Sequence, residues 1–313
     1  MEMIYLDSAT CLPEGACATI GFFDGVHRGH LALLEELKGL ANEHGLLSMV
    51  ITFAEHPRQV VGTDWQPRLL TTLEEKRRLI GEAGIDRLVV LRFDEAMAGL
   101  SAREFMLRVL KAQLGVRMLL TGYDNRFGHD RREGFDDYVA YGSKMGIDVR
   151  LGRMLSVGEG AVSSSRVRRL LTAGNVAEAA ECLGRRYGIA GRVVHGEQIG
   201  RRMGFPTANM EPDDGLKLVP MDGVYAVTAM VEGEDVALQG LMNIGSRPTF
   251  KGHWRTLEVH LLDFGADIYG RRLRVTFVER LRDELHFESA EALRLQMAQD
   301  EAQARRLFAV LAD

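Results

Sequence analysis

Cysteine is scarce in this 313-residue chain, which contains only Cys11, Cys17 and Cys182. They form no C-x-x-C pair, and three cysteines cannot all be joined in disulfides, so a reducing compartment is the simpler interpretation. The N-terminal sequence MEMIYLDSAT has no basic segment followed by an apolar one, which argues against a secretory signal. No apolar run approaches the roughly 20 residues of a membrane span. We therefore expect a cytoplasmic protein without a membrane partner.

A basic excess is also missing, since the formal net charge at pH 7 is −5. General nucleic-acid binders usually carry an excess of Lys and Arg, so we expect no nucleic-acid partner. The composition, 46% hydrophobic and 27% charged, is typical of globular proteins, and the length suits two domains. The oligomeric state is left open by the sequence.

The first half of the chain alternates apolar runs with helical patterns. In LALLEELKGLANEHG, for example, Leu33, Leu37 and Leu40 fall on one helical face. This alternation predicts an α/β domain with a parallel sheet covered on both sides. We expect further helices over 73–83 and 102–114, and strands over 16–23, 46–53, 87–93, 117–122 and 147–155.

The second half follows a different pattern. Short segments rich in Val, Thr and aromatic residues are separated by glycine-containing turns, and a helical pattern returns only in ESAEALRLQMAQDEAQARRLFAVL. This predicts a small β-barrel with a terminal helix packed outside it. We place the domain boundary at the turn-rich sequence LGRRYG, which gives domains over 1–184 and 185–313. The expected barrel strands are 189–195, 224–231, 238–244, 257–264 and 273–279.

The string ATIGFFDGVHRGH, residues 18–30, joins the first apolar run to the first helix. Its glycines let the backbone turn sharply, and α/β sheets bind ligands beyond the carboxyl ends of their strands. A helix N-terminus there suits a phosphate chain, with His27 and His30 on one face as donors. On this string alone, a plain helix cap is an alternative. Zinc is disfavoured because acidic or cysteine companions are missing at ligand spacing, and both G-x-G-x-x-G and G-x-x-x-x-G-K-[ST] are absent.

A second candidate phosphate site lies in VSSSRVRRLL, residues 162–171. Serines such as Ser164 and Ser165 suit a helix cap, and Arg166 and Arg168 follow in the first turns. Hydroxyls and guanidinium groups together suit a triphosphate, although capped basic helices are also common on protein surfaces. Because the string follows the last strand of the predicted sheet, whose first strand is followed by the histidine loop, we favour the phosphate interpretation.

The most distinctive string of the second half is GEQIGRRMGFPTANM, residues 196–210. Its glycines permit close approach to phosphate, while the Thr207 hydroxyl and the Asn209 amide oxygen are hard ligands that suit Mg²⁺. Downstream, Glu258 and His260 point to the same side of an alternating strand, LEVHLLDF. A carboxylate there could take a proton from an alcohol that attacks a γ-phosphate. Taken alone, Glu258 is more simply interpreted as a solvated strand residue.

The histidine string resembles the G-x-F-D-G-V-H-x-G-H signature of the Rossmann-like nucleotidyltransferase domain in bacterial FAD synthetases. TFAEHP (52–57), TGYDNRFG (121–128) and VSSSRVRRLL resemble later motifs of that family in the same order. The resemblance implies transfer of an adenylyl group from ATP to FMN, with His27, His30 and Arg166 as catalytic residues. The implied ATP and phosphate contacts are Gly21, Phe23, Gly25, His27, His30, Asp124, Ser164, Ser165, Arg166 and Arg168.

Three positions depart from that family's pattern. Glu55 stands where proline is usual, Ser165 where threonine is usual, and Asn125 where an aromatic residue is frequent. The change at Asn125 puts an adenine or flavin contact in question. A domain that has lost adenylyl transfer and only packs structurally is therefore one alternative, and cytidylyl transfer to a polyol phosphate is another.

The strings GFPTAN, NIGSRPTF, LEVHLLDF and LRDELHF occur in the order found in riboflavin kinases. That resemblance implies that Thr207 and Asn209 attend Mg²⁺ and ATP, and that Glu258 is the catalytic base. It also implies phosphate contacts at Gly200, Arg201, Gly204, Thr207 and Asn209, and flavin contacts at Arg282, Glu284 and Phe287.

Together the two resemblances imply a bifunctional enzyme that phosphorylates riboflavin to FMN and then adenylylates FMN to FAD. Its substrates would be riboflavin, FMN and ATP, with Mg²⁺ as the cofactor. A non-catalytic flavin-binding protein is the alternative from a different class. The presence of Thr207, Asn209 and Glu258 argues against it, because a binder needs no base.

Overall fold

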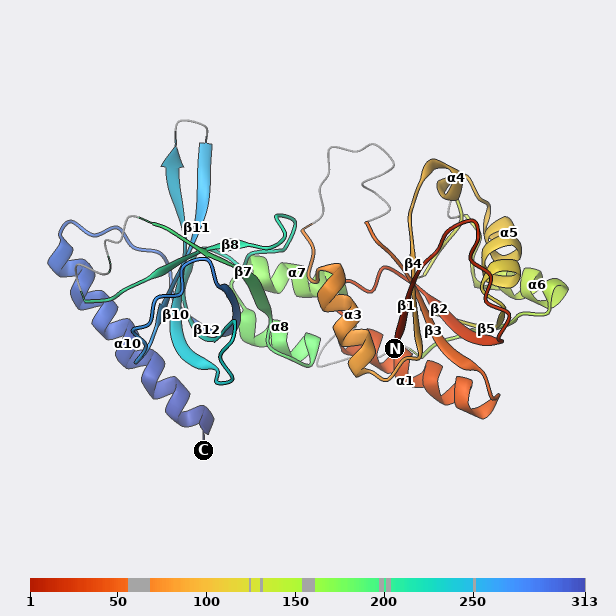
Figure 1. Ribbon diagram of the computed structural model, residues 1–313, viewed down its shortest axis with the longest axis horizontal. Helices are drawn as coiled ribbons and strands as arrows, with labels where there is room; N and C mark the ends of the chain where they lie inside the picture. The colour runs from red at the N-terminus through yellow and green to blue at the C-terminus, as the bar shows by residue number, and fades with distance from the viewer. Residues whose placement is uncertain are drawn as a thin grey trace. The chain divides into compact units, whose positions relative to one another are not determined.

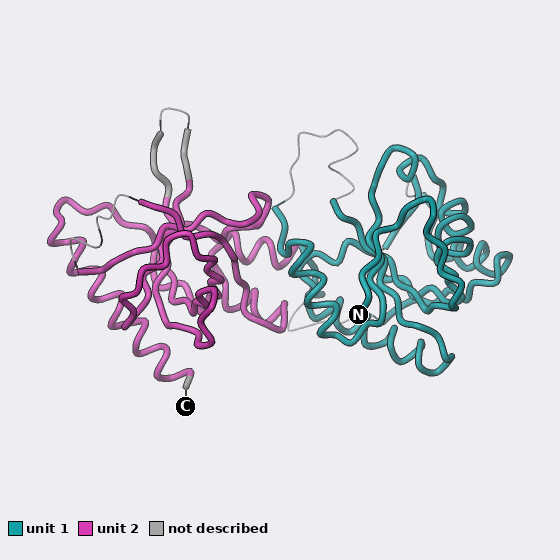
Figure 2. Tube along the Cα trace, viewed as in Figure 1, with its two compact units in different colours: residues 1–164 teal, residues 165–313 magenta. Residues whose placement is uncertain are grey.

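The computed structural model describes residues 1–55, 68–123, 125–129, 132–153, 161–196, 200, 204–249 and 252–312, without the side chains of 246–249, 252–254 and 312. The chain divides into two compact units, Met1–Ser164 and Ser165–Asp313 (Figure 2). None of the helices in the described ranges is both long enough and apolar enough to span a membrane.

A six-stranded sheet forms the centre of the first unit (Figure 1). Its strand order is β1-β4-β3-β2-β5-β6, and every neighbouring pair is parallel. The inner strands consist largely of buried apolar residues, as a sheet covered on both faces requires. The strands are β1 (Glu2–Tyr5), β2 (Ala16–Ile20), β3 (Leu47–Phe53), β4 (Arg87–Leu91), β5 (Val116–Thr121) and β6 (Asp148–Leu151).

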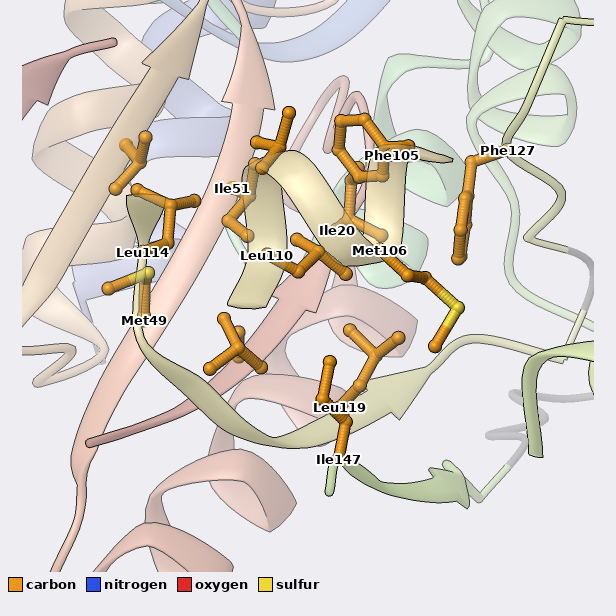
Figure 3. Close-up of a cluster of buried hydrophobic side chains, with 14 of the residues drawn as sticks. Ile20, Met49, Ile51, Phe105, Met106, Leu110, Leu114, Leu119, Phe127 and Ile147 are labelled. Carbon is orange, nitrogen blue, oxygen red and sulfur yellow. The ribbon is translucent and has the colours of Figure 1, made fainter. Parts of the chain in front are cut away.

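Helices cover both faces of this sheet. Successive strand residues point to opposite faces, so Val89 of β4 joins one hydrophobic cluster while Leu88 and Val90 join another. The first cluster, drawn in Figure 3, packs strand residues such as Ile51 against Leu110 and its helical neighbours. The helices are α1 (Arg28–Glu43), α3 (Leu73–Glu82), α4 (Glu95–Ala98), α5 (Ala102–Phe105), the π-helix η1 (Met106–Gln113) and α6 (Phe135–Met145).

The order of the strands reverses at β2. The chain passes from β2 through α1 to β3 on one side, whereas β5 pairs with β2 on the other side. The carboxyl ends of β2 and β5 therefore flank a topological switch point, where open α/β sheets bind ligands. The segment that follows β2 contains both histidines of the sequence motif.

The second unit is built on a closed antiparallel barrel with the strand order β10-β11-β8-β7-β12-β9. The terminal helix packs outside it, where Ala304 and Phe308 contact a cluster that includes Val224 and Leu241 of the barrel. The elements are α7 (Ser164–Thr172), α8 (Val176–Leu183), β7 (Gly188–Val194), β8 (Ala208–Pro212), β9 (Gly223–Val231), β10 (Leu238–Thr249), β11 (Gly252–Leu261), β12 (Arg272–Arg282) and α10 (Ala290–Ala312).

The predicted fold class is confirmed, with a parallel α/β sheet followed by a small barrel and a terminal helix. Two strands were missed: β1, a short edge strand, and β8, which begins at the end of the glycine-rich motif of residues 196–210. The predicted boundary after residue 184 stays a prediction. The division after Ser164 assigns α7 and α8 to the unit that contains the barrel.

Candidate active sites

The chain leaves β2 through a loop with an unusual backbone. Phe23, Gly25 and Val26 have positive φ angles of 51°, 83° and 38°. Glycine tolerates this region, but a β-branched residue such as Val26 rarely adopts it. Strain of this kind persists only where the surrounding structure holds the backbone in place, and it concentrates at functional sites.

The carboxylate of Asp24 fastens this loop to the turn before α3. It is 2% exposed and accepts hydrogen bonds from the N–H groups of Leu70 (2.9 Å) and Thr71 (3.0 Å) and from the Thr71 hydroxyl (3.2 Å). The Gly25 N–H donates to the Thr71 hydroxyl oxygen at 3.0 Å. The sequence motif does not indicate this role, because the partners of Asp24 lie more than 40 residues further along the chain.

Two further hydroxyls bind carbonyl groups of the loop. Thr52, in β3, donates to the Phe22 carbonyl at 3.2 Å, and Ser164 donates to the Asp24 carbonyl at 2.8 Å. The Ser164 hydroxyl therefore supports the loop, while its predicted contact with phosphate stays a prediction.

The two histidines stack on one another at the start of α1. Their ring centroids are 3.6 Å apart and their planes differ by 15°, so the predicted common face is confirmed. His27 is the N-cap, and its Nδ1 accepts a hydrogen bond from the His30 N–H at 3.3 Å. Because Nδ1 accepts, a neutral His27 ring carries its proton on Nε2, where it can be donated to a ligand.

Phe23 and Gly21 belong to the loop that precedes the two histidines. The Phe23 ring is 3% exposed and stands edge-on to the His30 ring, with centroids 5.1 Å apart. A Cβ on Gly21 would come within 3.1 Å of the Phe23 ring, so a side chain there would press on the loop. Phe23 supports His30 and Gly21 leaves room for the Phe23 ring, while the predicted contacts of both residues with ATP stay predictions.

Asn125 links the loop that follows β5 to the end of β2 at the switch point. Its side-chain Nδ2 donates to the Ile20 carbonyl at the end of β2. The amide that replaces the family's aromatic residue thus has a structural partner. Glu55, another departure, is exposed. The predicted contact Asp124 and the last two residues of TFAEHP lie outside the described residues.

The remaining predicted residues of this group lie on α7. Ser165 is exposed there, and Arg166 and Arg168 are half-buried. All three belong to the second unit, and their contacts with ATP stay predictions.

In the second unit, Thr207, Asn209 and Glu258 come together where β8 pairs with β11. Asn209 and Glu258 are opposite one another in the ladder, and the Thr207 hydroxyl lies 3.5 Å from a Glu258 carboxylate oxygen. A Cβ on Gly196 would collide with the Asn209 side chain, so the glycine makes room for it. A hydroxyl, an amide oxygen and a carboxylate are ligands that Mg²⁺ accepts, so these residues fit the predicted metal. Across the described ranges there is no cluster of three or more His, Cys, Asp or Glu residues that could hold a metal ion. A metal at this site would therefore also need the Thr207 hydroxyl and the Asn209 amide oxygen as ligands.

Thr207 lines two cavities of this unit. One has a volume of about 280 Å³, and the other has a volume of about 270 Å³. Glu258 and His260 line the smaller cavity, whereas Val259 and Leu261 line the larger one. Adjacent residues of β11 therefore serve different cavities, as an alternating strand requires. The predicted common orientation of Glu258 and His260 is confirmed.

The three predicted flavin contacts lie in the same cavity as Glu258. Arg282, Glu284 and Phe287 all line it, and Met297 of α10 contributes to its wall. The structure thus brings together the predicted base and the predicted flavin residues, which are separated by a strand and a loop in the sequence.

Arg282 also anchors the terminal helix. Its Nε lies 2.9 Å from Oδ1 of Asp300, and its Nη2 lies 2.7 Å from Oδ2. Asp300 is 3% exposed and accepts a further hydrogen bond from Gln296 at 2.9 Å. Sequence analysis missed Asp300, because a helical pattern does not show which acidic residue meets a charged partner on the barrel.

The predicted phosphate contacts of the glycine-rich motif are only partly described. Gly200 lines the 270 Å³ cavity beside Thr207, and Gly204 adopts a left-handed φ of 86°. Arg201 lies outside the described residues. Their contacts with phosphate stay predictions.

The first unit has a strained, histidine-bearing loop at the switch point of a parallel sheet, and the second has a carboxylate beside two cavities. These features are those of a two-domain enzyme with a ligand site in each domain. Comparison with known proteins specifies the class. A family model described as FAD synthetase matches residues 10–166, and one described as riboflavin kinase matches residues 183–308.

Full-length relatives show both domains in one chain. The chain is 41% identical over 295 residues to the bifunctional riboflavin kinase/FMN adenylyltransferase of Escherichia coli (strain K12), covering 94% of this chain and 93% of the relative. It is 42% identical over 297 residues to the enzyme of the same name from Pseudomonas fluorescens, covering 95% and 94%. This chain belongs to the bifunctional riboflavin kinase/FMN adenylyltransferase family.

A solved structure shares the whole architecture. It is the crystal structure described as a macrolide-efflux protein from Streptococcus pneumoniae, which is 30% identical, with a TM-score of 0.89 over 97% of this chain and 99% of that one.

The Arg282–Asp300 pair predicts a measurable effect on stability. Asp300→Ala leaves the Arg282 charge without its buried partner, so we expect the free energy of unfolding of the second unit to fall by about 3 kcal/mol. Replacing both charges, in Arg282→Met/Asp300→Leu, should cost less because no buried charge is left over. Urea unfolding followed by circular dichroism measures both. Arg305→Ala, on the same helix, breaks an exposed pair with Asp263; it is the control and should change little. If Asp300→Ala is as stable as the parent, the pair does not anchor α10.

Proposed function

We propose that this chain carries out both reactions of its family, phosphorylation of riboflavin to FMN and adenylylation of FMN to FAD, through two separate sets of residues. One observation carries the proposal: Thr207 and Glu258 meet at 3.5 Å where two cavities share Thr207 as a lining residue. A phosphoryl donor and an acceptor need such neighbouring spaces, with a base in the space that holds the attacking alcohol.

In the kinase reaction, Glu258 accepts the proton of the riboflavin 5′-hydroxyl as its oxygen attacks the γ-phosphorus of ATP. The new P–O bond forms while the bond to the β-phosphate oxygen breaks, which yields FMN and ADP. The flavin occupies the 270 Å³ cavity with Arg282, Glu284 and Phe287, and ATP occupies the cavity on the other side of β11. Thr207 and Asn209 would hold Mg²⁺, which would neutralise negative charge on the phosphates when bound.

In the adenylyl transfer, a phosphate oxygen of FMN attacks the α-phosphorus of ATP. The bond to the β-phosphate oxygen breaks, which yields FAD and pyrophosphate. Since the FMN phosphate is already an anion, no protein nucleophile is needed, and catalysis comes from positioning and from donors to the developing charge. Nε2 of His27 and the stacked His30 ring supply those donors.

The histidine pair is tested by His30→Ala. Loss of one transition-state donor should lower the rate of FAD formation from FMN by about 10²-fold, while FMN formation from riboflavin persists. Chromatography of the flavin products over time measures both rates. His44→Ala, at the exposed C-cap of the same helix, is the matched control. An unchanged adenylylation rate in His30→Ala removes this histidine from the mechanism.

The base is tested by Glu258→Gln. The amide cannot take the proton, so riboflavin phosphorylation should stop, while supplied FMN is still converted to FAD. The same assay, started once from riboflavin and once from FMN, separates the two activities. Glu279→Gln, an exposed glutamate of β12, serves as the control. Normal phosphorylation by Glu258→Gln would place the base elsewhere.

A further inference from the structure

A lysine is buried beneath the histidine loop. Lys76 of α3 is 2% exposed, although its neighbour Arg77 on the same helix is exposed. Its ammonium lies 3.3 Å from the Thr52 hydroxyl and 4.0 Å from the centroid of the Phe22 ring. A buried lysine is rare because its charge loses the solvation of water.

The groups that Lys76 contacts either belong to the histidine loop or are hydrogen-bonded to it. Thr52 accepts from the ammonium and donates its own proton to the Phe22 carbonyl at 3.2 Å. Asp24, two residues further along, acts on Lys76 as a negative charge from the loop. On α3 itself, the Glu75 carboxylate accepts from the Thr72 N–H and completes the helix cap. Lys76 therefore acts on the segment that precedes His27 by a hydrogen-bond chain, by a ring contact and by charge.

The charge of Lys76 does not favour folding. Burial lowers its pKa to about 8, and Asp24 opposes that effect only in part. A lysine whose pKa is lower in the folded state than in the unfolded state releases its proton more readily on folding. Stability therefore rises with pH between about 8 and the unfolded value, and below about 8 the buried charge opposes folding. If this position had only a structural role, an apolar side chain would stabilise the folded state more than a lysine does.

We propose that Lys76 is a positioning residue for adenylyl transfer, whose ammonium holds the strained loop of Phe22 to Val26 in the conformation that presents His27 and His30. The inference rests on the proposed function of the histidine loop. It concerns a residue that touches neither ATP nor FMN, and its effect is transmitted through Thr52, the Phe22 carbonyl and Asp24.

The first test compares Lys76→Met with Arg77→Met. Methionine keeps most of the volume of the lysine side chain but removes the charge, so we expect the melting temperature to stay unchanged or to rise. We expect FAD formation from FMN to fall by about 10- to 100-fold, the scale of a small misplacement of catalytic groups. Arg77→Met should change neither quantity. A Lys76→Met variant that melts lower and loses activity in proportion to its unfolded fraction would show a merely structural lysine.

The second test is the pH profile. In the parent enzyme, kcat/KM for FMN adenylylation should fall as pH rises through about 8, because the neutral amine no longer supplies the positive charge. In Lys76→Arg the side chain stays charged throughout, so this alkaline limb should disappear. Phosphorylation of riboflavin by the same preparations provides the comparison, since its site lies in the other unit.

The outcomes separate this inference from the proposed function. If the parent enzyme and Arg77→Met make no FAD from FMN, the proposed adenylyl transfer itself is wrong. If both make FAD and Lys76→Met does so at the parental rate, or if the alkaline limb is unchanged in Lys76→Arg, the positioning role is overturned.

Discussion

The carboxylate of Asp24 accepts hydrogen bonds from the backbone and hydroxyl of Thr71 and from the Leu70 N–H, and the first active site depends on this cluster. Left-handed backbone at Phe23 and Val26 is unfavourable, so the loop keeps its shape only because buried partners fix it. The consequence reaches the histidines, since His27 begins α1 at the point where this loop ends. The motif aspartate thus belongs to the scaffold, and it fixes the loop from which the two stacked histidines follow.

The second unit positions its candidate site residues in a different way. Two cavities meet at Thr207, and the alternation of β11 sends Glu258 to one of them and Val259 to the other. Thr207 lines both, and the pairing of β8 with β11 fixes Asn209 opposite Glu258. The terminal helix is held beside the cavity that Glu258 lines by the Arg282–Asp300 pair. In this unit strand register positions the candidate site residues, whereas in the first unit a loop fixed by buried hydrogen bonds does so.

Much of this could be predicted from the sequence, and the failures have physical reasons. Continuous apolar runs such as LVVL identify buried parallel strands, and the alternation of LEVHLLDF places Glu258 beside His260. The strand β8 was missed because its five residues, ANMEP, begin at the end of the glycine-rich motif and lack β-branched and aromatic side chains, and β1 because a four-residue edge strand has little pattern. Asp24 and Lys76 were missed for another reason. Their roles depend on partners brought close only by the fold, and a lysine in an amphipathic helix is ordinarily exposed.

The two sites of this account break ATP at different bonds, and that difference can be measured directly. The purified chain would be given riboflavin, Mg²⁺ and ATP carrying a phosphorus label at either the α or the γ position, and the flavins would be separated over time. The account predicts γ label in FMN and later in FAD, and α label in FAD alone, with release of pyrophosphate. Accumulation of γ-labelled FMN without any α label in a flavin product would contradict it.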